Sequence, residues 1–569
     1  DASTTASLNT AIGYLALTEN TTGTQNVAVG AYALDAATTG GFNTACGTAA
    51  LGSNTEGQLN TAVGRSALNA NTVADGNTAV GYDALTDNTT GVNNVAVGAY
   101  ALAAAETVSN NTAIGRSALA NNTTGSKNTA VGSNTLLANT TGTNNIAIGR
   151  GALDANTTAD NNTAVGTESL TANTTGTFNV GLGYATLEAN TTADNNTAVG
   201  AVALNAVISG GHNTAVGSHA LDVVSTGEKN TAIGSNALGA NTVSENTAVG
   251  YYALSGNTTG TYNTAMGVQA MHQTTTSQRG TAVGYFALDA GNAGDRNSAF
   301  GFQALTSLTT GGHNTAIGDA AMEAATTGNY NVAMGQAALV TCTTGHNNTA
   351  IGTRALDAFN GNENTAVGID ALGACTTGQY NVSVGADSAE FLTTGQYNTS
   401  VGHDSMRYCN GSNNTFIGQG AGLGVSGGTT GSQNTGIGRN ALNDLTTGGD
   451  NTAVGSYAAD NLTTGFDNVY VGDNAGNTHA TGNGCVLVGR ACNTSSTSVH
   501  EENVFGRNLT GKGGETTFLG GTTGTFNEAN ETHFDTTSDS RIKKNITNYN
   551  TGLSIINQLQ VRNFEYKTE

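Results

Sequence analysis

Apolar and polar residues recur in fixed columns along this chain, at a spacing of 17 residues. The unit is clearest from Asn60 to Gly64, where the sequence is Asn-Thr-Ala-Val-Gly. Its Asn recurs at 9, 26, 43, 60, 77 and 94, and the pattern continues to Gly506. A short fixed period of this kind is typical of one small unit that stacks many times. We therefore predict an all-β parallel β-roll, or β-solenoid, of about 30 coils.

Each position of the unit, numbered from its Asn, has its own residue preference. Thr or Val at position 2, Ala at position 3 and Val or Ile at position 4 predict a short strand with a period of two. Position 5 is always Gly, which indicates a backbone with φ > 0 or close approach of a neighbouring coil. We expect the stacked Asn side chains to form ladders that satisfy the amides of the turns.

Two columns are expected to supply the core. We expect the Val or Ile of position 4 to point inward, with Cys46 as a core replacement, while Ala keeps the other face flat enough for close packing. Leu or Met at position 9 predicts a second short strand, and Thr-Thr-Gly at positions 13 to 15 predicts a turn. Seventeen residues allow a perimeter of at most about 55 Å, which suits two sheets about 10 Å apart. Because such a core is thin, we expect the roll to self-associate along its length.

The spacing slips at four places. The units before 246, 364 and 414 are one residue short, and the unit before 434 is three residues long. We expect these slips to lie in a turn, where the chain tolerates changes of length.

The amino-acid composition limits the kinds of molecule that this chain is expected to bind. The formal net charge is −22, from 40 acidic and 18 basic residues. Nucleic acid is not expected as a partner, because phosphate binding needs a cluster of Lys and Arg. No run of about 18 apolar residues is present, so no membrane insertion is expected. The sequence starts at Asp1 rather than Met, and we expect it to be a portion of a longer product.

The six cysteines favour packing over chemistry. They lack metal-ligand spacing such as Cys-x-x-Cys. Three of them share one column two repeats apart, about 10 Å between neighbours, which is too far for a disulfide. Cys485 and Cys492 lie within one coil and are close enough in sequence to pair. The six are Cys46, Cys342, Cys375, Cys409, Cys485 and Cys492.

The repeat sequence gives little support for catalysis, cofactor binding or metal binding. No nucleophile elbow, phosphate loop or zinc motif is present, so we expect no cofactor, no metal site and no catalysis in the repeat region. Calcium binding and ice binding are weaker alternatives, because the calcium nonapeptide is missing and the paired Thr lies in a turn. The column before Asn holds aromatic residues that either stack on sugar rings or cover the edge of the coil below. These are Phe42, Phe178, Tyr262, Tyr330, Tyr380 and Tyr397.

Two resemblances point to a family. The unit from Asn145 to Gly149, Asn-Ile-Ala-Ile-Gly, resembles the head repeats of trimeric autotransporter adhesins. That resemblance implies a left-handed parallel β-roll with three chains side by side. The segment from Ser538 to Ile546, Ser-Asp-Ser-Arg-Ile-Lys-Lys-Asn-Ile, resembles the start of the intramolecular chaperone domain of endosialidase-type phage tailspikes and fibres.

The second resemblance implies self-cleavage. In that family the chaperone trimerises the fibre and then releases itself through a Ser/Lys pair, which matches Ser538 and Lys543 here. A desolvated Lys with a lowered pKa can deprotonate a Ser for attack on the neighbouring peptide bond. The alternative is that Ser538 merely caps a turn before a basic strand.

These observations predict three regions and a structural role. Residues 1–506 form the β-roll shaft, 507–537 an irregular β connector, and 538–569 a truncated α+β start of the chaperone domain. We expect a homotrimeric phage tail fibre on the virion, with a host-surface glycan or receptor as a candidate partner. The alternative is a bacterial trimeric adhesin on the cell surface. A polysaccharide-cleaving enzyme on a β-solenoid is disfavoured, because no coil carries its own acidic or His cluster.

Overall fold

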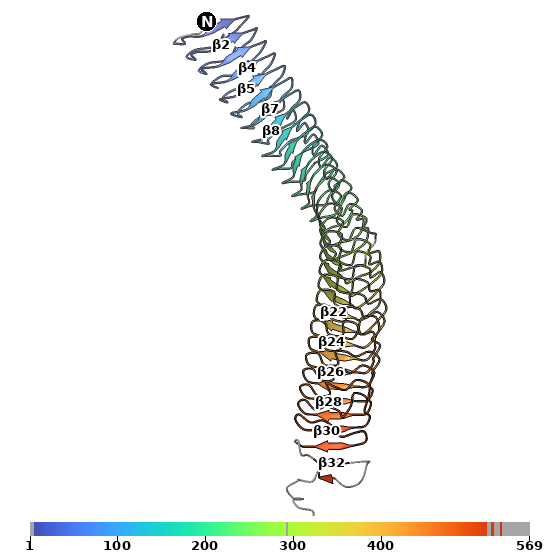
Figure 1. Ribbon diagram of the computed structural model, residues 1–569. Coiled ribbons are helices and arrows are strands. Elements are labelled where there is room, and N and C mark those ends of the chain that lie inside the picture. The colour runs from blue at the N-terminus through green and yellow to red at the C-terminus, as the bar shows by residue number, and fades with distance from the viewer. Residues whose placement is uncertain (1–4, 292–293, 521–524, 528–534, 537–569) are drawn as a thin grey trace, which may run out of the picture. The chain divides into compact units, whose positions relative to one another are not determined.

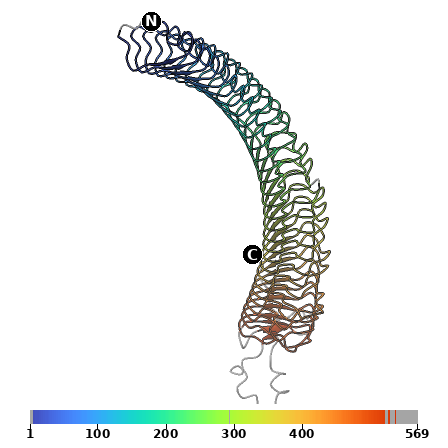
Figure 2. The ribbon, with the colours of Figure 1, turned by 90° about the horizontal axis from the view of Figure 1, so that it is seen from above.

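The computed structural model describes residues 5–291, 294–520, 525–527 and 535–536. Contacts divide the chain into one unit of residues 1–380 and a second of residues 381–569. The described residues form strands and turns and contain no helix, and hence no helix long and apolar enough to cross a membrane. Within each unit one short strand per coil stacks on the next, as Figure 1 and Figure 2 show.

The first unit contains 22 strands of three residues each, and each strand pairs in parallel with the next. The register advances by one repeat, so that Ala62 of β4 lies beside Ala79 of β5. The strands are β1 (Thr10–Ile12), β2 (Val27–Val29), β3 (Thr44–Cys46), β4 (Thr61–Val63), β5 (Thr78–Val80), β6 (Val95–Val97), β7 (Thr112–Ile114), β8 (Thr129–Val131), β9 (Ile146–Ile148), β10 (Thr163–Val165), β11 (Val180–Leu182), β12 (Thr197–Val199), β13 (Thr214–Val216), β14 (Thr231–Ile233), β15 (Thr247–Val249), β16 (Thr264–Met266), β17 (Thr281–Val283), β18 (Ser298–Phe300), β19 (Thr315–Ile317), β20 (Val332–Met334), β21 (Thr349–Ile351) and β22 (Thr365–Val367).

The second unit continues the same pattern and ends differently. Strands β23 to β31 pair in parallel, whereas β31 with β32 and β32 with β33 pair antiparallel. The strands are β23 (Val382–Val384), β24 (Thr399–Val401), β25 (Thr415–Ile417), β26 (Thr435–Ile437), β27 (Thr452–Val454), β28 (Val469–Val471), β29 (Val486–Val488), β30 (Asn503–Phe505), β31 (Thr517–Leu519), β32 (Thr525–Asn527) and β33 (Asp535–Thr536). The prediction of an all-β parallel β-solenoid of about 30 coils is confirmed.

The strand residue that faces the interior is not the one expected. The Ala of position 3 is fully buried, as at Ala62 and Ala113, while the Val or Ile of position 4 points outward. Ile114 is 39% exposed, and Cys46 at the same position is exposed rather than in the core. Because side chains alternate along a strand, only one of these two columns can face inward. The large Leu of position 9 already fills the space opposite, and only a small residue fits against it.

The second side of the coil is not the predicted strand. Positions 7 and 9 adopt left-handed backbone conformations, with φ of 61° at Tyr32 and 50° at Leu34. Their amides still bond between coils, since Leu34 N donates to Ala50 O at 3.1 Å and Tyr32 N to Tyr14 O at 2.8 Å. A left-handed Leu costs about 1–2 kcal/mol, and its complete burial contributes about 1.5–3 kcal/mol. Position 9 holds no β-branched residue from Leu17 to Gly476, which is consistent with this geometry.

The Asn ladder is confirmed. The Oδ1 of Asn26 accepts the backbone amide of Asn43 at 2.9 Å in the next coil, and its Nδ2 donates to Gly40 O at 2.9 Å. These side chains are fully buried, so each ladder bond replaces water on a turn amide or carbonyl. The invariant Gly of position 5 meets both expectations, because Gly30 has φ of +139° and an added Cβ would lie 2.5 Å from Gly47 O.

A second Asn column at position 12 escaped the sequence analysis. Asn71 Nδ2 donates to Asn54 Oδ1 at 2.7 Å and to Ala74 O at 3.1 Å. Where the next coil has Ala105 in this column, the Oδ1 of Asn88 is buried without a partner. The sequence signal is the Asn that precedes Thr-Thr in many coils, as at Asn88, Asn122 and Asn139, where it resembles an ordinary turn residue.

Two coils in the second unit exchange the large and the small residue of positions 3 and 9. Phe416 takes position 3 and Gly422 takes position 9, where an added Cβ would lie 2.5 Å from the Phe416 ring. Tyr470 and Gly476 repeat the exchange, and the hydroxyl of Tyr470 hydrogen-bonds the Nδ1 of the buried His479. The interior therefore holds one large side chain for each such pair of positions.

This exchange is testable in one coil. Phe416→Ala leaves a cavity that costs about 3–5 kcal/mol, and Gly422→Leu alone overpacks the ring by about 1–3 kcal/mol. The double variant restores the Ala and Leu pair of other coils and should recover most of the loss. Hydrogen exchange of β25 and β26, followed by mass spectrometry, measures the local opening. Exchange in the double variant as fast as in Phe416→Ala would contradict the account.

Candidate binding pocket beside an inserted loop

The one lengthened coil carries its extra residues just before position 12. Cys409, at position 12 of its coil, pairs as an isolated bridge with Thr429 of the next coil. Residues 425–428 are therefore inserted ahead of that position, and the turn that follows is one residue shorter than usual. The insertion is exposed throughout. It thus lies beside the expected turn rather than within it.

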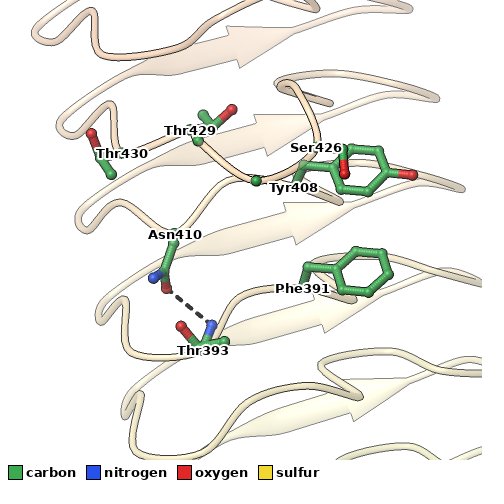
Figure 3. A pocket seen from close by; sticks show the side chains of 9 residues that line it. Phe391, Thr393, Tyr408, Asn410, Ser426, Thr429 and Thr430 are labelled. Atoms are coloured by element: carbon green, nitrogen blue, oxygen red, sulfur yellow. Dashed lines mark hydrogen bonds between the residues drawn. The ribbon is translucent and has the colours of Figure 1, made fainter.

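This loop forms one wall of a cavity of about 410 Å³, shown in Figure 3. The other walls come from the two preceding coils, through the rings of Phe391 and Tyr408 and the polar side chains of Thr393 and Asn410. The two rings occupy position 11 of consecutive coils. They are stacked, with centroids 5.2 Å apart and planes inclined by 5°.

Arg407 holds the ring pair from one side. Its guanidinium carbon lies 5.9 Å from the Phe391 centroid and 5.5 Å from that of Tyr408. The same group pairs with Glu390 and Asp404, at 2.7 Å each. Burial alone would lower the pKa of Arg407, but the hydrogen bond that Arg407 donates to Asp404 and the charge of Glu390 raise the pKa above its ordinary value. The cation is therefore permanent, and it is neutralised locally.

Asn410 shapes the opposite wall. Its Oδ1 accepts the backbone amides of Thr393 at 3.0 Å, Thr394 at 2.9 Å and Gly395 at 3.2 Å. The bond to Thr393 is drawn in Figure 3. The carboxamide thus caps amides that the shortened turn would otherwise leave unpaired.

A cluster of ligand-type side chains adjoins the pocket. One oxygen or nitrogen each of Asp387, His403 and Asp404 come within 4.8 Å of one another. Asp404 already pairs with Arg407 at 2.7 Å and with His403 at 2.7 Å, and Asp387 lies 3.7 Å from Arg407. Since a guanidinium already supplies the positive charge that a cation would bring, this cluster is best described as an ion-pair network.

The residues that the sequence analysis singled out have different outcomes. Ser538 and Lys543 lie outside the described residues. The aromatic side chains before Asn are exposed, from 42% at Tyr380 to 59% at Phe178, and only Tyr380 and Tyr397 belong to consecutive repeats. Tyr330 stacks on His313 at 4.8 Å. Phe391 and Tyr408 were missed, although two aromatic residues in one column directly before the lengthened coil are visible in the aligned repeats.

All six cysteines are free thiols, including Cys485 and Cys492. Five are buried, and burial raises the pKa of Cys342 to about 11 and that of Cys375 to about 12. Such thiols stay protonated at neutral pH and act as packing groups. Cys46 alone is exposed, on the outer face of β3.

Comparison with known protein families, with curated proteins and with solved structures finds no match to this chain.

Proposed function

We propose that this chain is the structural shaft of a fibre, in which copies of the chain pack side by side through the outer face of their strands. The observation that carries this proposal is the outward column at position 4. We call this column, with position 2 beside it, the strand face. Its exposed position-4 side chains are Ile12, Val63, Ile114, Ile148, Leu182, Ile233, Met266, Phe300, Ile317, Met334 and Ile351 in the first unit, and Val384, Ile417, Ile437 and Val471 in the second.

An exposed apolar column like that of position 4 is costly in water. Burial of an exposed Val or Ile contributes up to about 1.5–3 kcal/mol, so a modest gain in each coil becomes large when many coils are in contact. A partner must present matching side chains at every coil. Another copy of this chain, parallel and in register, has the same repeat and meets that requirement. The number of three copies comes from the resemblance to trimeric adhesin heads, and closed threefold symmetry limits the assembly.

We further propose that the fibre belongs to a phage tail, serves in host attachment and is located on the virion. The support is the segment from Ser538 to Ile546 and its resemblance to a self-cleaving chaperone. In the alternative, a bacterial trimeric surface adhesin, the strand face would have the same role, and no cleavage at this segment is expected.

The oligomeric state tests the strand face directly. Ile114→Lys with Ile148→Lys adds two charges to the face of each copy and should shift the trimer toward a folded monomer in sedimentation velocity at low protein concentration. The matched control is Ile208→Lys with Val223→Lys, because these side chains are similarly exposed, at 47% and 44%, but lie off the strand. The control should remain trimeric. A wild-type chain that sediments as a fully folded monomer would contradict the proposal.

Self-cleavage is tested separately, on the natural product. On incubation, wild-type protein should release a C-terminal fragment, detected by intact mass, with the new end at Ser538. Ser538→Ala should stay uncut because the attacking hydroxyl is lost, and Lys543→Met should be strongly slowed because the base is lost. An unchanged fragment mass and rate in Ser538→Ala would overturn the assignment of the dyad.

A further inference from the structure

We propose that the pocket beside residues 425–428 binds a neutral saccharide. The proposal deepens the attachment role above and rests on it, since it names the ligand class and the place on the shaft where binding occurs. Three independent features carry it: the paired rings, the uncharged lining and the position on the coil.

The ring pair supplies an apolar surface of the right kind. Phe391 is 43% exposed, and its ring and that of Tyr408 line the cavity together. The C–H bonds of a pyranose pack on aromatic rings, which bury a large apolar area in a rigid geometry. Arg407 holds the two rings in place, so little side-chain freedom is lost on binding. A cavity of about 410 Å³ is of the size that encloses one or two sugar rings.

The lining selects an uncharged ligand with many hydroxyl groups. The residues around the cavity are Phe391, Thr393, Tyr408, Asn410, Ser426, Gly427, Gly428, Thr429 and Thr430, and none carries a charge. Hydroxyl groups donate and accept hydrogen bonds, as sugar hydroxyls do. The Oδ1 of Asn410 is committed to the amides of the neighbouring coil, so its Nδ2 is the group that can donate to a ligand oxygen. An anionic sugar would find no cationic partner in this lining.

The pocket lies away from the strand face. Its side chains come from position 11 onward, and Figure 3 shows them on the loop side of the coils with the strands behind. Val384 and Ile417 of the same coils are exposed on the strands, whereas Leu392 and Phe416 are fully buried in the interior. Packing of copies through the strand face therefore leaves the pocket open to solvent.

The inserted loop and the ring pair occur together once among the described coils. Position 11 is otherwise mostly Ala or a small polar residue, and Phe391 and Tyr408 are its only aromatic residues in the repeats. Residues 425–428 add no core side chain, since Val425 is 41% exposed and the other three are exposed as well. The insertion serves the cavity rather than the stacking of coils.

The test uses the whole chain on an array of neutral oligosaccharides built from hexoses and N-acetylhexosamines, followed by calorimetry with the best binder. Phe391→Ala with Tyr408→Ala should weaken binding by at least about tenfold. Deletion of residues 425–428 should weaken binding to a similar extent, although it leaves both rings in place. The matched control is Phe466→Ala, an exposed ring of the same unit outside the pocket and outside the column before Asn.

Sedimentation of the same samples separates the two proposals. Pocket variants should remain trimeric while losing the saccharide, which excludes misfolding as the cause. A wild-type chain that binds no neutral glycan on the array overturns the saccharide site. Pocket variants that bind the glycan as tightly as wild type would also overturn the saccharide site. A monomeric chain that binds the glycan through Phe391 and Tyr408 overturns the shaft proposal alone.

Discussion

The structure depends on one constraint inside the coil, the shallow space that the side chains of positions 3 and 9 share. Ala62 and Leu68 are both fully buried in the coil that begins at Asn60. The space between the strand and the opposite side admits one large side chain, and Phe416 with Gly422 shows that it can come from either side. Because this interior is so shallow, buried hydrogen bonds carry much of the stacking. Asn26 and its counterparts supply them in every coil except those that begin at Gly280, Cys485 and Glu502.

The shallow interior also determines the outer surface. Once Ala faces inward, strand alternation places the Val or Ile of position 4 outside, as at Ile114 and Ile148. A monomer thus exposes the apolar column that an ordinary sheet would bury. The account of the shaft follows from this inversion, because the side chains that fail to fill the coil are available to join one copy to another. Phe391 and Tyr408 line the pocket in which we propose that a saccharide binds.

The sequence alone predicts the coil, the parallel ladder, the Gly of position 5 and the Asn ladder, because each needs only a period and a residue type. It does not predict which strand face is inside. Hydrophobicity favours Val63 over Ala62 for the core, and the deciding fact is the space already taken by Leu68, which is a tertiary property. The left-handed conformation of Leu34 is also hidden, since Leu seldom adopts it. The pocket needs the register across coils, which places Phe391 under Tyr408.

The reactivity of Cys46 gives the most direct test of the strand face. It is the exposed cysteine of the chain and lies on the outer side of β3, while the other five are buried. If copies cover this face, a maleimide should label Cys46 slowly in the native assembly and rapidly after Ile114→Lys with Ile148→Lys separates the chains. Mass spectrometry locates the label. Labelling of native Cys46 at the rate of a small-molecule thiol would show that the face is uncovered and would contradict the account.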